Sequence, residues 1–464
     1  MAKLKLGIVA DAGSPTGFST VTHNIAWALQ ESGEYDIEIL GINFDGKPNE
    51  WSKKLSMWPA RLGGDFLGIG YVSQFYEEVK PDVLFLFQDF WNISQYLPRL
   101  PQNAPGVVAY YPVDAPNIKG QYMLGMGATT ATACYTEFGV QESMRAAKEA
   151  WKTVQEQAAQ SDLDLLNFIT VEIGGMNDKV GDKVGGGQVI VPVKRLRQLC
   201  KPEGYTVIPH GVDVSIFHPV PTADAREKLK IQKDWFVVGN VNRNQSRKRQ
   251  DLTIRAFAKF AEDKPDARLI LHCVRNDPRG WDLHQLGVYY GVDDKIIMTH
   301  ALFDGARATE EELNYIYNSF DVQINTCGGE GWGLTNFEGA ACGTAQIVPD
   351  WSATKEIWEG TGLLIDVAEV RHEMSMINTM QAVIDSSHAA SLLNELYEDR
   401  LKLAKVGADC LAVTQRPEYK WENVGKQFDK LFKASAGKPP KSGEVALTHD
   451  GVQKLKNAKK MQFS

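Results

Sequence analysis

The sequence predicts an α/β protein with two doubly wound parallel sheets, on the basis of its length and of a pattern that occurs twice. The 464 residues exceed one ordinary core and suit two domains of roughly 200 residues each. In each half, short apolar runs typical of buried strands alternate with helical spacing. These runs are residues 5–10, 37–42, 82–87 and 107–111, and then 235–239, 268–274, 295–298 and 322–325.

The first half begins with a strand, a glycine-containing loop and a helix. The helix carries apolar residues at helical spacing, and Ser19 is expected to cap it. Residues 141–190 are interpreted as an excursion: a polar, helix-prone stretch leads into a Gly- and Asp-rich segment that suits a mobile loop or hairpin. We therefore expect an N-terminal domain over residues 1–204.

The alternation restarts near Tyr205, which predicts a C-terminal domain over residues 205–415. An amphipathic helix is expected at residues 251–260, between two strands of the second sheet. A further helix is expected at residues 422–432, and residues 436–464 form a Lys-rich tail that we expect to be loosely ordered.

Composition narrows the class of protein. The formal charge of −8 argues against global attraction to phosphate-rich surfaces. The six scattered cysteines form no C-x-x-C pair, which favours a reducing compartment and disfavours a cysteine metal site. Neither a signal peptide nor a run of eighteen apolar residues is visible, so we expect a cytoplasmic protein, or one of the host cytoplasm if the source is viral, without a membrane span.

Residues 325–349 carry the strongest chemical pattern. Glu330 and Glu338, eight residues apart, flank a glycine-rich loop between a strand that ends near Asn325 and a helix that begins near Thr335. Such a loop lets backbone N–H groups approach an anion, and the helix N-terminus favours a phosphate. The two carboxylates suit hydrogen bonds from sugar hydroxyls. A plain turn between strand and helix with capping acids fits the same spacing.

A basic loop within residues 239–257 is the second pattern. It contains Arg243, Arg247, Lys248 and Arg249. Two cations beside a pyrophosphate would stabilise the charge on a leaving nucleoside diphosphate. A solvated basic surface fits the same residues.

Polar residues also follow strands of the first half. Asp114 comes after the apolar run at residues 107–111, and Gln88 and Asp89 come after the preceding run. Asp114 suits orientation of an acceptor or of the sugar, or an ordinary turn. The pair Asp162 and Asp164 forms a D-x-D, which we interpret as a solvated surface because no strand precedes it.

Three segments resemble retaining glycosyltransferases of family four, and one of them is residues 239–257, which resemble that family's strand-loop-helix motif with an Arg and a Lys at the donor diphosphate. The segment EGWGLTNFEGAACGTAQIV resembles that family's E-x7-E cassette, with Trp332 in place of the common Phe and Ala345 in place of the common Pro. Residues 207–217 (VIPHGVDVSIF) resemble the interdomain phrase V-I-P-N-G-V-D-x-x-x-F, with His210 in place of Asn. The resemblance covers residues 207–358 well and the first domain in outline.

The resemblance implies the GT-B fold, in which two Rossmann-like domains face each other across a cleft and a helix, here residues 416–435, crosses back to the first domain. It implies that Glu330 lies beside the donor sugar and that Glu338 binds ribose hydroxyls. We assign Glu330 and Asp114 to catalysis. The remaining implied donor-binding residues are Gly13, Gly17, Arg243, Lys248, Gly333, Leu334 and Thr335, with Arg247 as a rival to Arg243.

The activity implied is transfer of a sugar from a nucleoside diphosphate sugar, UDP-linked, to a hydroxyl acceptor with retention of configuration. Neither a metal nor another cofactor is expected, and the absence of G-x-G-x-x-G disfavours an NAD enzyme. The acceptor is expected to be a glycan, a glycolipid or a hydroxymethylated pyrimidine flipped out of DNA. Basic clusters that suit DNA phosphates are Lys194, Arg195, Arg197 and Lys201, and Lys454, Lys456, Lys459 and Lys460.

The alternative is a non-catalytic protein of the same fold that binds a sugar nucleotide or a glycan. The presence of Glu330, Glu338 and Lys248 favours the enzyme. The sequence does not predict the oligomeric state.

Overall fold

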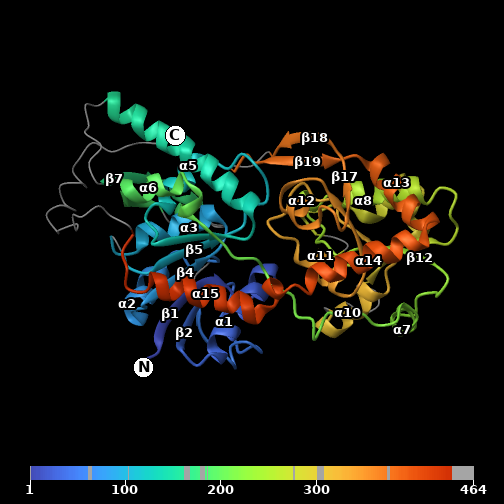
Figure 1. Cartoon of the computed structure of the whole chain (residues 1–464), viewed down its shortest axis with the longest axis horizontal. Helices are drawn as coiled ribbons and strands as arrows, with labels where there is room; N and C mark the ends of the chain where they lie inside the picture. Colours follow the sequence, from blue (N-terminus) through green and yellow to red (C-terminus); the bar gives the residue numbers. More distant parts are fainter. Residues whose placement is uncertain are drawn as a thin grey trace. The chain divides into compact units, whose positions relative to one another are not determined.

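The computed structural model describes residues 2–60, 65–102, 104–160, 168–177, 183–184, 186–274, 277–299, 308–373 and 377–440. They form two compact units (Figure 1). The first contains the described residues of Met1–Val113, Asn117–His210 and Trp421–Ser464, and the second contains Asp114–Pro116 and those of Gly211–Lys420.

The first unit is built on a parallel sheet that, among the described residues, has seven strands in the order β11-β6-β5-β4-β1-β2-β3. The strands predicted in this half are all present, and β4 and β5 are buried along their whole length. The bounds are β1 (Leu4–Asp11), β2 (Tyr35–Ile42), β3 (Ser56–Pro59), β4 (Val83–Phe87), β5 (Val107–Tyr111), β6 (Ala131–Cys134) and β11 (Thr206–Val207).

Helices complete the first unit: α1 (Gly17–Glu31), α2 (Val72–Val79), α3 (Phe90–Tyr96), α4 (Gly120–Met126), α5 (Glu137–Gln160), α6 (Val193–Leu199) and α15 (Trp421–Ser435). Figure 1 shows α15 beside α1, against which it packs. Val424, Phe428 and Phe432 lie on the buried face of α15, and the Phe428 ring stands 5.3 Å from that of Phe85 in β4. This apolar stripe explains why α15 groups with the first unit although it follows the second in the chain.

Three details of the first unit differ from expectation or refine it. Ser19 is not the cap of α1, because the helix begins two residues earlier and Thr16 accepts a hydrogen bond from the Ser19 N–H group. The excursion is a long helix, α5, followed by an antiparallel hairpin of β7 (Phe168–Ile173) and β10 (Gly187–Pro192). The first sheet includes β11, which pairs in parallel with β6, so it extends beyond the domain boundary expected after residue 204.

The second unit repeats the architecture. Its parallel sheet has, in the described part of the chain, six strands in the order β14-β13-β12-β15-β16-β17. The bounds are β12 (Phe236–Asn240), β13 (Ala267–Leu271), β14 (Ile296–Met298), β15 (Val322–Ile324), β16 (Ala345–Pro349) and β17 (Leu363–Ile365). The strands predicted in this half are again present, which confirms two parallel α/β units.

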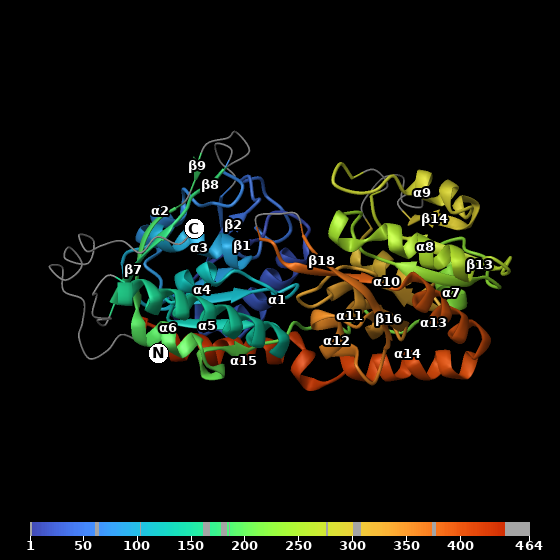
Figure 2. The ribbon, with the colours of Figure 1, turned by 90° about the horizontal axis from the view of Figure 1, so that it is seen from above.

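The helices of the second unit are α7 (Thr222–Lys228), α8 (Gln250–Phe260), α9 (Leu283–Tyr289), α10 (Glu310–Asn318), α11 (Leu334–Ala341), α12 (Ser352–Trp358), α13 (Ser386–Glu398) and α14 (Arg400–Thr414). Helix α8 lies against α13 (Figure 2). A separate antiparallel hairpin, β18 (Val367–His372) with β19 (Met380–Ile384), follows β17. No helix in the described residues is long and apolar enough to cross a membrane.

The strand orders show where ligands are expected. In the first sheet the chain passes from β1 to β2 on one side and later adds β4 on the other; in the second sheet β13 and β15 flank β12 in the same way. Open parallel sheets bind ligands at the carboxyl ends of the strands where the order reverses. The loops after β12 and β15, and those after β1 and β4, are therefore the candidate positions.

Candidate functional site

The loops after β12 and β15 are held to each other by hydrogen bonds. The Gly328 N–H donates to the Arg247 carbonyl over 2.9 Å, and the Thr326 hydroxyl donates to the Arg249 carbonyl over 2.9 Å. The Thr326 and Thr253 hydroxyls lie 2.7 Å apart. These bonds place the basic loop and the glycine-rich loop of the sequence patterns side by side at the carboxyl edge of the second sheet.

Glu330 is the centre of this edge. Lys248 Nζ contacts its Oε1, and Arg247 Nη1 lies 3.3 Å from its Oε2. The Ser352 hydroxyl accepts from the Glu330 N–H at 3.1 Å, which fixes the backbone. Burial alone would raise the pKa of Glu330, but the charges of Lys248 and Arg247 outweigh it and lower that pKa to about 2. Glu330 is therefore an ionised hydrogen-bond acceptor at neutral pH.

The four basic residues have different surroundings. Arg247 and Lys248 contact Glu330, and Arg249 makes a two-pronged ion pair with Asp251 at 3.0 and 2.8 Å. Arg243 is exposed and makes no ion pair with a described residue. Thus, of the candidate diphosphate ligands, the structure brings Lys248 and Arg247 to Glu330 and leaves Arg243 apart from it.

Asp114 belongs to the short segment that groups with the second unit. Its Oδ2 lies 3.3 Å from Arg247 Nη1, so Arg247 bridges Asp114 and Glu330. Burial works against the charge of Arg247, but Asp114 and Glu330 more than compensate and raise its pKa. The two residues assigned to catalysis thus share one guanidinium.

The first turn of α11 follows directly. Gly333 has φ +93°, a left-handed conformation that favours glycine, and α11 begins at Leu334. The N–H groups of Asn336 and Phe337 bond to the Gly333 carbonyl, whereas those of Leu334 and Thr335 have no acceptor within the helix. This turn can therefore receive an anion.

Buried amides tie this turn to Glu330. Asn325 Nδ2 lies 3.5 Å from Glu330 Oε1 and 2.8 Å from Asn336 Oδ1, and Asn336 donates in turn to Gln346 at 2.9 Å. Gln323 donates to the Thr335 carbonyl at 3.0 Å. Because these amides are almost completely buried, they hold the acid and the helix start in a fixed relation.

Glu338 lies one turn into α11 and is partly exposed. The Tyr317 hydroxyl of α10 donates to Glu338 Oε2 over 2.5 Å. Burial raises the pKa of Glu338 to about 7, against the opposing effect of the Tyr317 hydrogen bond. Unlike Glu330, Glu338 therefore has no ion pair with a cation in the described part of the chain to hold its charge.

In the first unit, Asp11 is the last residue of β1 and directly precedes the loop that contains Gly13. Its carboxylate accepts from the Thr16 hydroxyl at 2.8 Å and from the Ser14 N–H at 3.3 Å, and burial raises its pKa. A side chain at Gly13 would come within 2.4 Å of backbone atoms of residues 43 and 44, so packing accounts for this glycine. Gly17 is the first residue of α1.

Gln88 and Asp89 follow β4 at the same edge. Gln88 is buried, and its Oε1 accepts from the Asn92 side chain and from the Asp89 N–H, both at 3.1 Å. Asp89 precedes α3. The two residues are thus placed at the carboxyl edge of the first sheet, as predicted.

The basic cluster near residue 195 is only partly a surface. Arg195 is buried, and its guanidinium donates to the carbonyls of Thr129 and Gly204 and to the Thr132 hydroxyl. Lys194, Arg197 and Lys201 are exposed. The prediction of a four-residue phosphate contact is therefore wrong for Arg195. The cluster at residues 454–460 and the D-x-D at residues 162–164 lie outside the described residues.

Sequence reasoning missed Tyr317, Asn325 and Ser352. Each contacts a predicted carboxylate or its backbone, but none belongs to a recognisable sequence motif. In the sequence, Tyr317 fits an apolar position of a helix, and Ser352 fits the start of a helix. Only the packing of α10 and α12 near α11 and Glu330 shows their positions.

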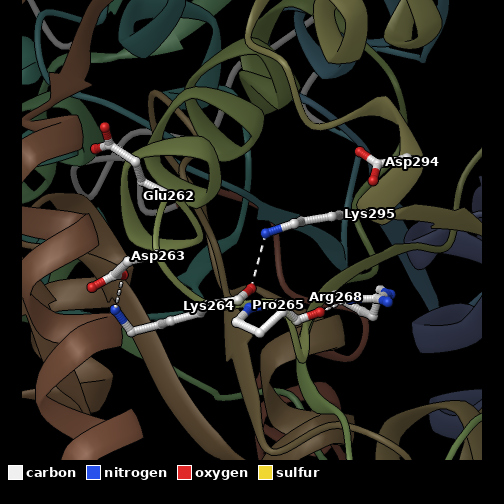
Figure 3. A pocket seen from close by; sticks show the side chains of 7 residues that line it. All are labelled: Glu262, Asp263, Lys264, Pro265, Arg268, Asp294 and Lys295. Carbon is white, nitrogen blue, oxygen red and sulfur yellow. Dashed lines mark hydrogen bonds and ion pairs between the residues drawn. The ribbon is translucent and has the colours of Figure 1, made fainter.

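A hollow of about 410 Å³ lies elsewhere, at the amino ends of β13 and β14 (Figure 3). Its cations serve the fold: Lys295 Nζ donates to the carbonyls of Ala261 and Lys264, and the Arg268 guanidinium lies 4.2 Å from the Trp235 ring. Since it lies on the sheet edge opposite Glu330, we assign the hollow no part in the site.

Comparisons with known proteins identify a family model and relatives that match this chain. Residues 232–384, which contain Lys248, Glu330 and Glu338, match the family model described as glycosyl transferases group 1. A D-inositol 3-phosphate glycosyltransferase of Thermobispora bispora is 27% identical over 233 residues, 50% of this chain and 50% of the relative. One of Stackebrandtia nassauensis is 32% identical over 155 residues, 32% and 33% of the two chains. The chain thus spans about half the length, or less, of these curated relatives.

Solved structures show the fold. Sucrose-phosphate synthase from Thermosynechococcus elongatus superposes with a TM-score of 0.61 at 15% identity, over 93% of this chain and 99% of that one. HepE of Anabaena, in complex with UDP and glucose, superposes with a TM-score of 0.59 at 15% identity, over 93% and 100%. The predicted resemblance is confirmed at this level: the chain has the GT-B fold and carries a glycosyl transferases group 1 domain over residues 232–384.

Proposed function

We propose that the protein transfers a sugar from a nucleoside diphosphate sugar, UDP-linked, to a hydroxyl acceptor with retention of configuration. The observation that carries the proposal is the ionised Glu330 between Lys248 and Arg247, directly before the start of α11. The two cations and the N–H groups of Leu334 and Thr335 suit a diphosphate, and Glu330 and Glu338 suit hydroxyl groups on either side of it. The HepE structure holds UDP and glucose, which supports the choice of base.

The charges suggest how these residues act. Because its pKa is about 2, Glu330 cannot donate a proton at neutral pH, and its pairing with two cations makes it a poor nucleophile. We assign it to accepting hydrogen bonds from the donor sugar. Arg247 and Lys248 would stabilise the charge that develops on the leaving diphosphate, and the leaving phosphate itself would help to deprotonate the acceptor.

The acceptor is proposed to be a sugar, a polyol or their phosphates rather than DNA. The curated relatives are named for an inositol phosphate acceptor. Within the cluster at residues 194–201, the buried Arg195 guanidinium donates its hydrogen bonds to groups of the protein itself, which weakens the DNA alternative. Asp114, Gln88 and Asp89 remain proposed acceptor-side residues, and Gly13 and Gly17 remain proposed neighbours of the donor.

The test is hydrolysis and transfer with a panel of nucleoside diphosphate sugars, using wild type and Glu330→Ala. We expect turnover of one UDP-sugar that falls at least about 100-fold in Glu330→Ala, with the α configuration of the donor retained in the product. Equal, tight donor binding by both proteins without turnover would favour the non-catalytic alternative. Since Lys248 and Arg247 are proposed to replace a metal, activity is expected to survive EDTA; loss in EDTA with rescue by manganese would contradict that assignment.

A further inference from the structure

The hydrogen bond between Tyr317 and Glu338 joins a buried group to a partly exposed one. Tyr317 lies on the last turn of α10 and is completely buried, whereas Glu338 lies on α11, which packs against α10. The Tyr317 backbone is held as well, since the Thr344 hydroxyl donates to its carbonyl at 2.9 Å. The phenol is therefore aimed at Glu338 Oε2 from a fixed position.

Towards an ionised Glu338, Tyr317 acts as the hydrogen-bond donor. Burial and the neighbouring Glu338 carboxylate raise its pKa well above 10, so it keeps its proton over the working range of pH. The other Glu338 oxygen, Oε1, accepts no hydrogen bond from the part of the chain that the structure describes. One oxygen is thus occupied by the protein and the other is left for a ligand.

We propose that Tyr317 is a positioning residue for the donor: its hydroxyl fixes Glu338 through Oε2, favours the carboxylate form and leaves Oε1 to accept the ribose hydroxyls. The inference rests on the donor site proposed above and deepens it. A carboxylate accepts from both hydroxyls of a diol, whereas a protonated acid must present one oxygen as a donor. Loss of the phenol would therefore weaken donor binding through the charge state of Glu338.

Among the described residues, few other titratable groups affect the pKa of Glu338. Glu310, at the start of α10, adds to the rise in the pKa of Glu338, and Cys342 directly after α11 has its own pKa raised by burial and by Glu338. The strand β16, which also packs on α11, contains no titratable residue. Helix α14 also packs on α11, and its titratable residues are Arg400, Lys402, Lys405, Asp409 and Cys410.

The first test needs no ligand. Urea unfolding of wild type, Tyr317→Phe, Glu338→Gln and the double variant is compared at pH 5.5 and pH 8.5. We expect Tyr317→Phe to lower the urea midpoint more at pH 8.5, where Glu338 is ionised, and this pH dependence to vanish in the Glu338→Gln background. An equal loss at both pH values would reduce Tyr317 to a packing residue and overturn the proposal.

The second test measures UDP-glucose binding by calorimetry from pH 5.5 to pH 8.5. UDP-glucose is preferred to UDP because a terminal phosphate ionises near pH 6 and would obscure the titration. We expect wild-type affinity to rise through about pH 7, and Tyr317→Phe to move this midpoint upward by about one unit. The variant would then bind about fivefold more weakly at pH 7 and nearly normally at pH 8.5.

Glu338→Gln is the control for this second test and should bind weakly without pH dependence. Coincident profiles of wild type and Tyr317→Phe would overturn the positioning role. If wild type bound no UDP-glucose, the ribose role would fall together with the proposed function, while the unfolding comparison would still decide whether Tyr317 and Glu338 are coupled.

Discussion

Glu330 and Glu338 stand eight residues apart on one loop-and-helix segment, but their surroundings favour opposite protonation states. Glu330 contacts Lys248 and Arg247, and its pKa falls to about 2. Among the described residues, the Glu338 carboxyl has a hydrogen bond from the neutral Tyr317 hydroxyl and no ion pair, and burial raises its pKa to about 7. The partners of each carboxyl, rather than burial alone, thus decide its charge.

The difference fits the two roles proposed for these acids in the donor site. A carboxylate fixed in its charge by two cations suits a constant electrostatic environment around the leaving diphosphate. A carboxyl that titrates near neutrality suits a binding group whose strength depends on pH. Pairs of acids with divergent pKa values are a common mark of functional sites.

The largest expected effect is that of Lys248→Ala. The change removes a cation of the proposed diphosphate site and one of the two charges that keep Glu330 ionised. We expect kcat/KM for UDP-glucose turnover to fall at least about 100-fold. The control is Lys259→Ala, an exposed lysine on α8 of the same unit, and comparable activity of both variants would argue against the site.

A smaller effect distinguishes the two candidate arginines. Arg247→Gln removes a guanidinium that contacts Glu330, whereas Arg243→Gln removes an exposed one. We expect the Kd for UDP to rise about tenfold in the first variant and about twofold in the second, measured by calorimetry. The reverse order would restore Arg243 as the diphosphate ligand expected from the resemblance.

Glu330→Gln tests whether the acid competes with the donor for its cations. Without the carboxylate, Lys248 and Arg247 lose an internal counter-ion. We expect UDP, which lacks the sugar, to bind about threefold more tightly while turnover of UDP-glucose falls. Weaker UDP binding by this variant would show that Glu330 does not compete with the diphosphate.

The smallest effect concerns stability around Glu338. Its folded-state pKa of about 7 lies above the ordinary value of 4.5, so its stabilising contribution is present below pH 4.5 and is lost as the pH rises through about 7. The Tm of Glu338→Gln minus that of wild type should therefore rise by about 3 °C from pH 5 to pH 8, measured by calorimetry. The matched control is Glu311→Gln, which changes an exposed acid on α10. The same rise in Tm for this control would contradict a specific effect of Glu338.

Much of this organisation was predictable from sequence because it rests on local patterns. The strands at residues 82–87 and 107–111 are continuous apolar runs, and they are buried strands in the structure. The predicted change from strand to helix between residues 325 and 335 agrees with β15 and α11 to within one residue. Glu330 and Lys248 could each be proposed as donor-site residues because of the resemblance, whereas their ion pair is a finding of the structure.

Other features depend on contacts that no local pattern encodes. Arg243 and Arg247 lie in one basic loop, and which of them turns toward Glu330 depends on the hydrogen bond from Gly328 to the Arg247 backbone. The burial of Arg195 depends on the Thr129 carbonyl and the Thr132 hydroxyl, which lie more than 60 residues away in the chain. Tyr317 reaches Glu338 because α10 packs against α11.

The second unit is proposed to bind a nucleoside diphosphate sugar between Lys248 and Glu338. Calorimetric titration of wild type, Lys248→Ala and Glu338→Gln with UDP-glucose at pH 8 tests this proposal. We predict one bound UDP-glucose per wild-type chain, and at least about tenfold weaker binding in each variant, because each loses a partner of the donor. Binding of equal strength in all three proteins would contradict the claim.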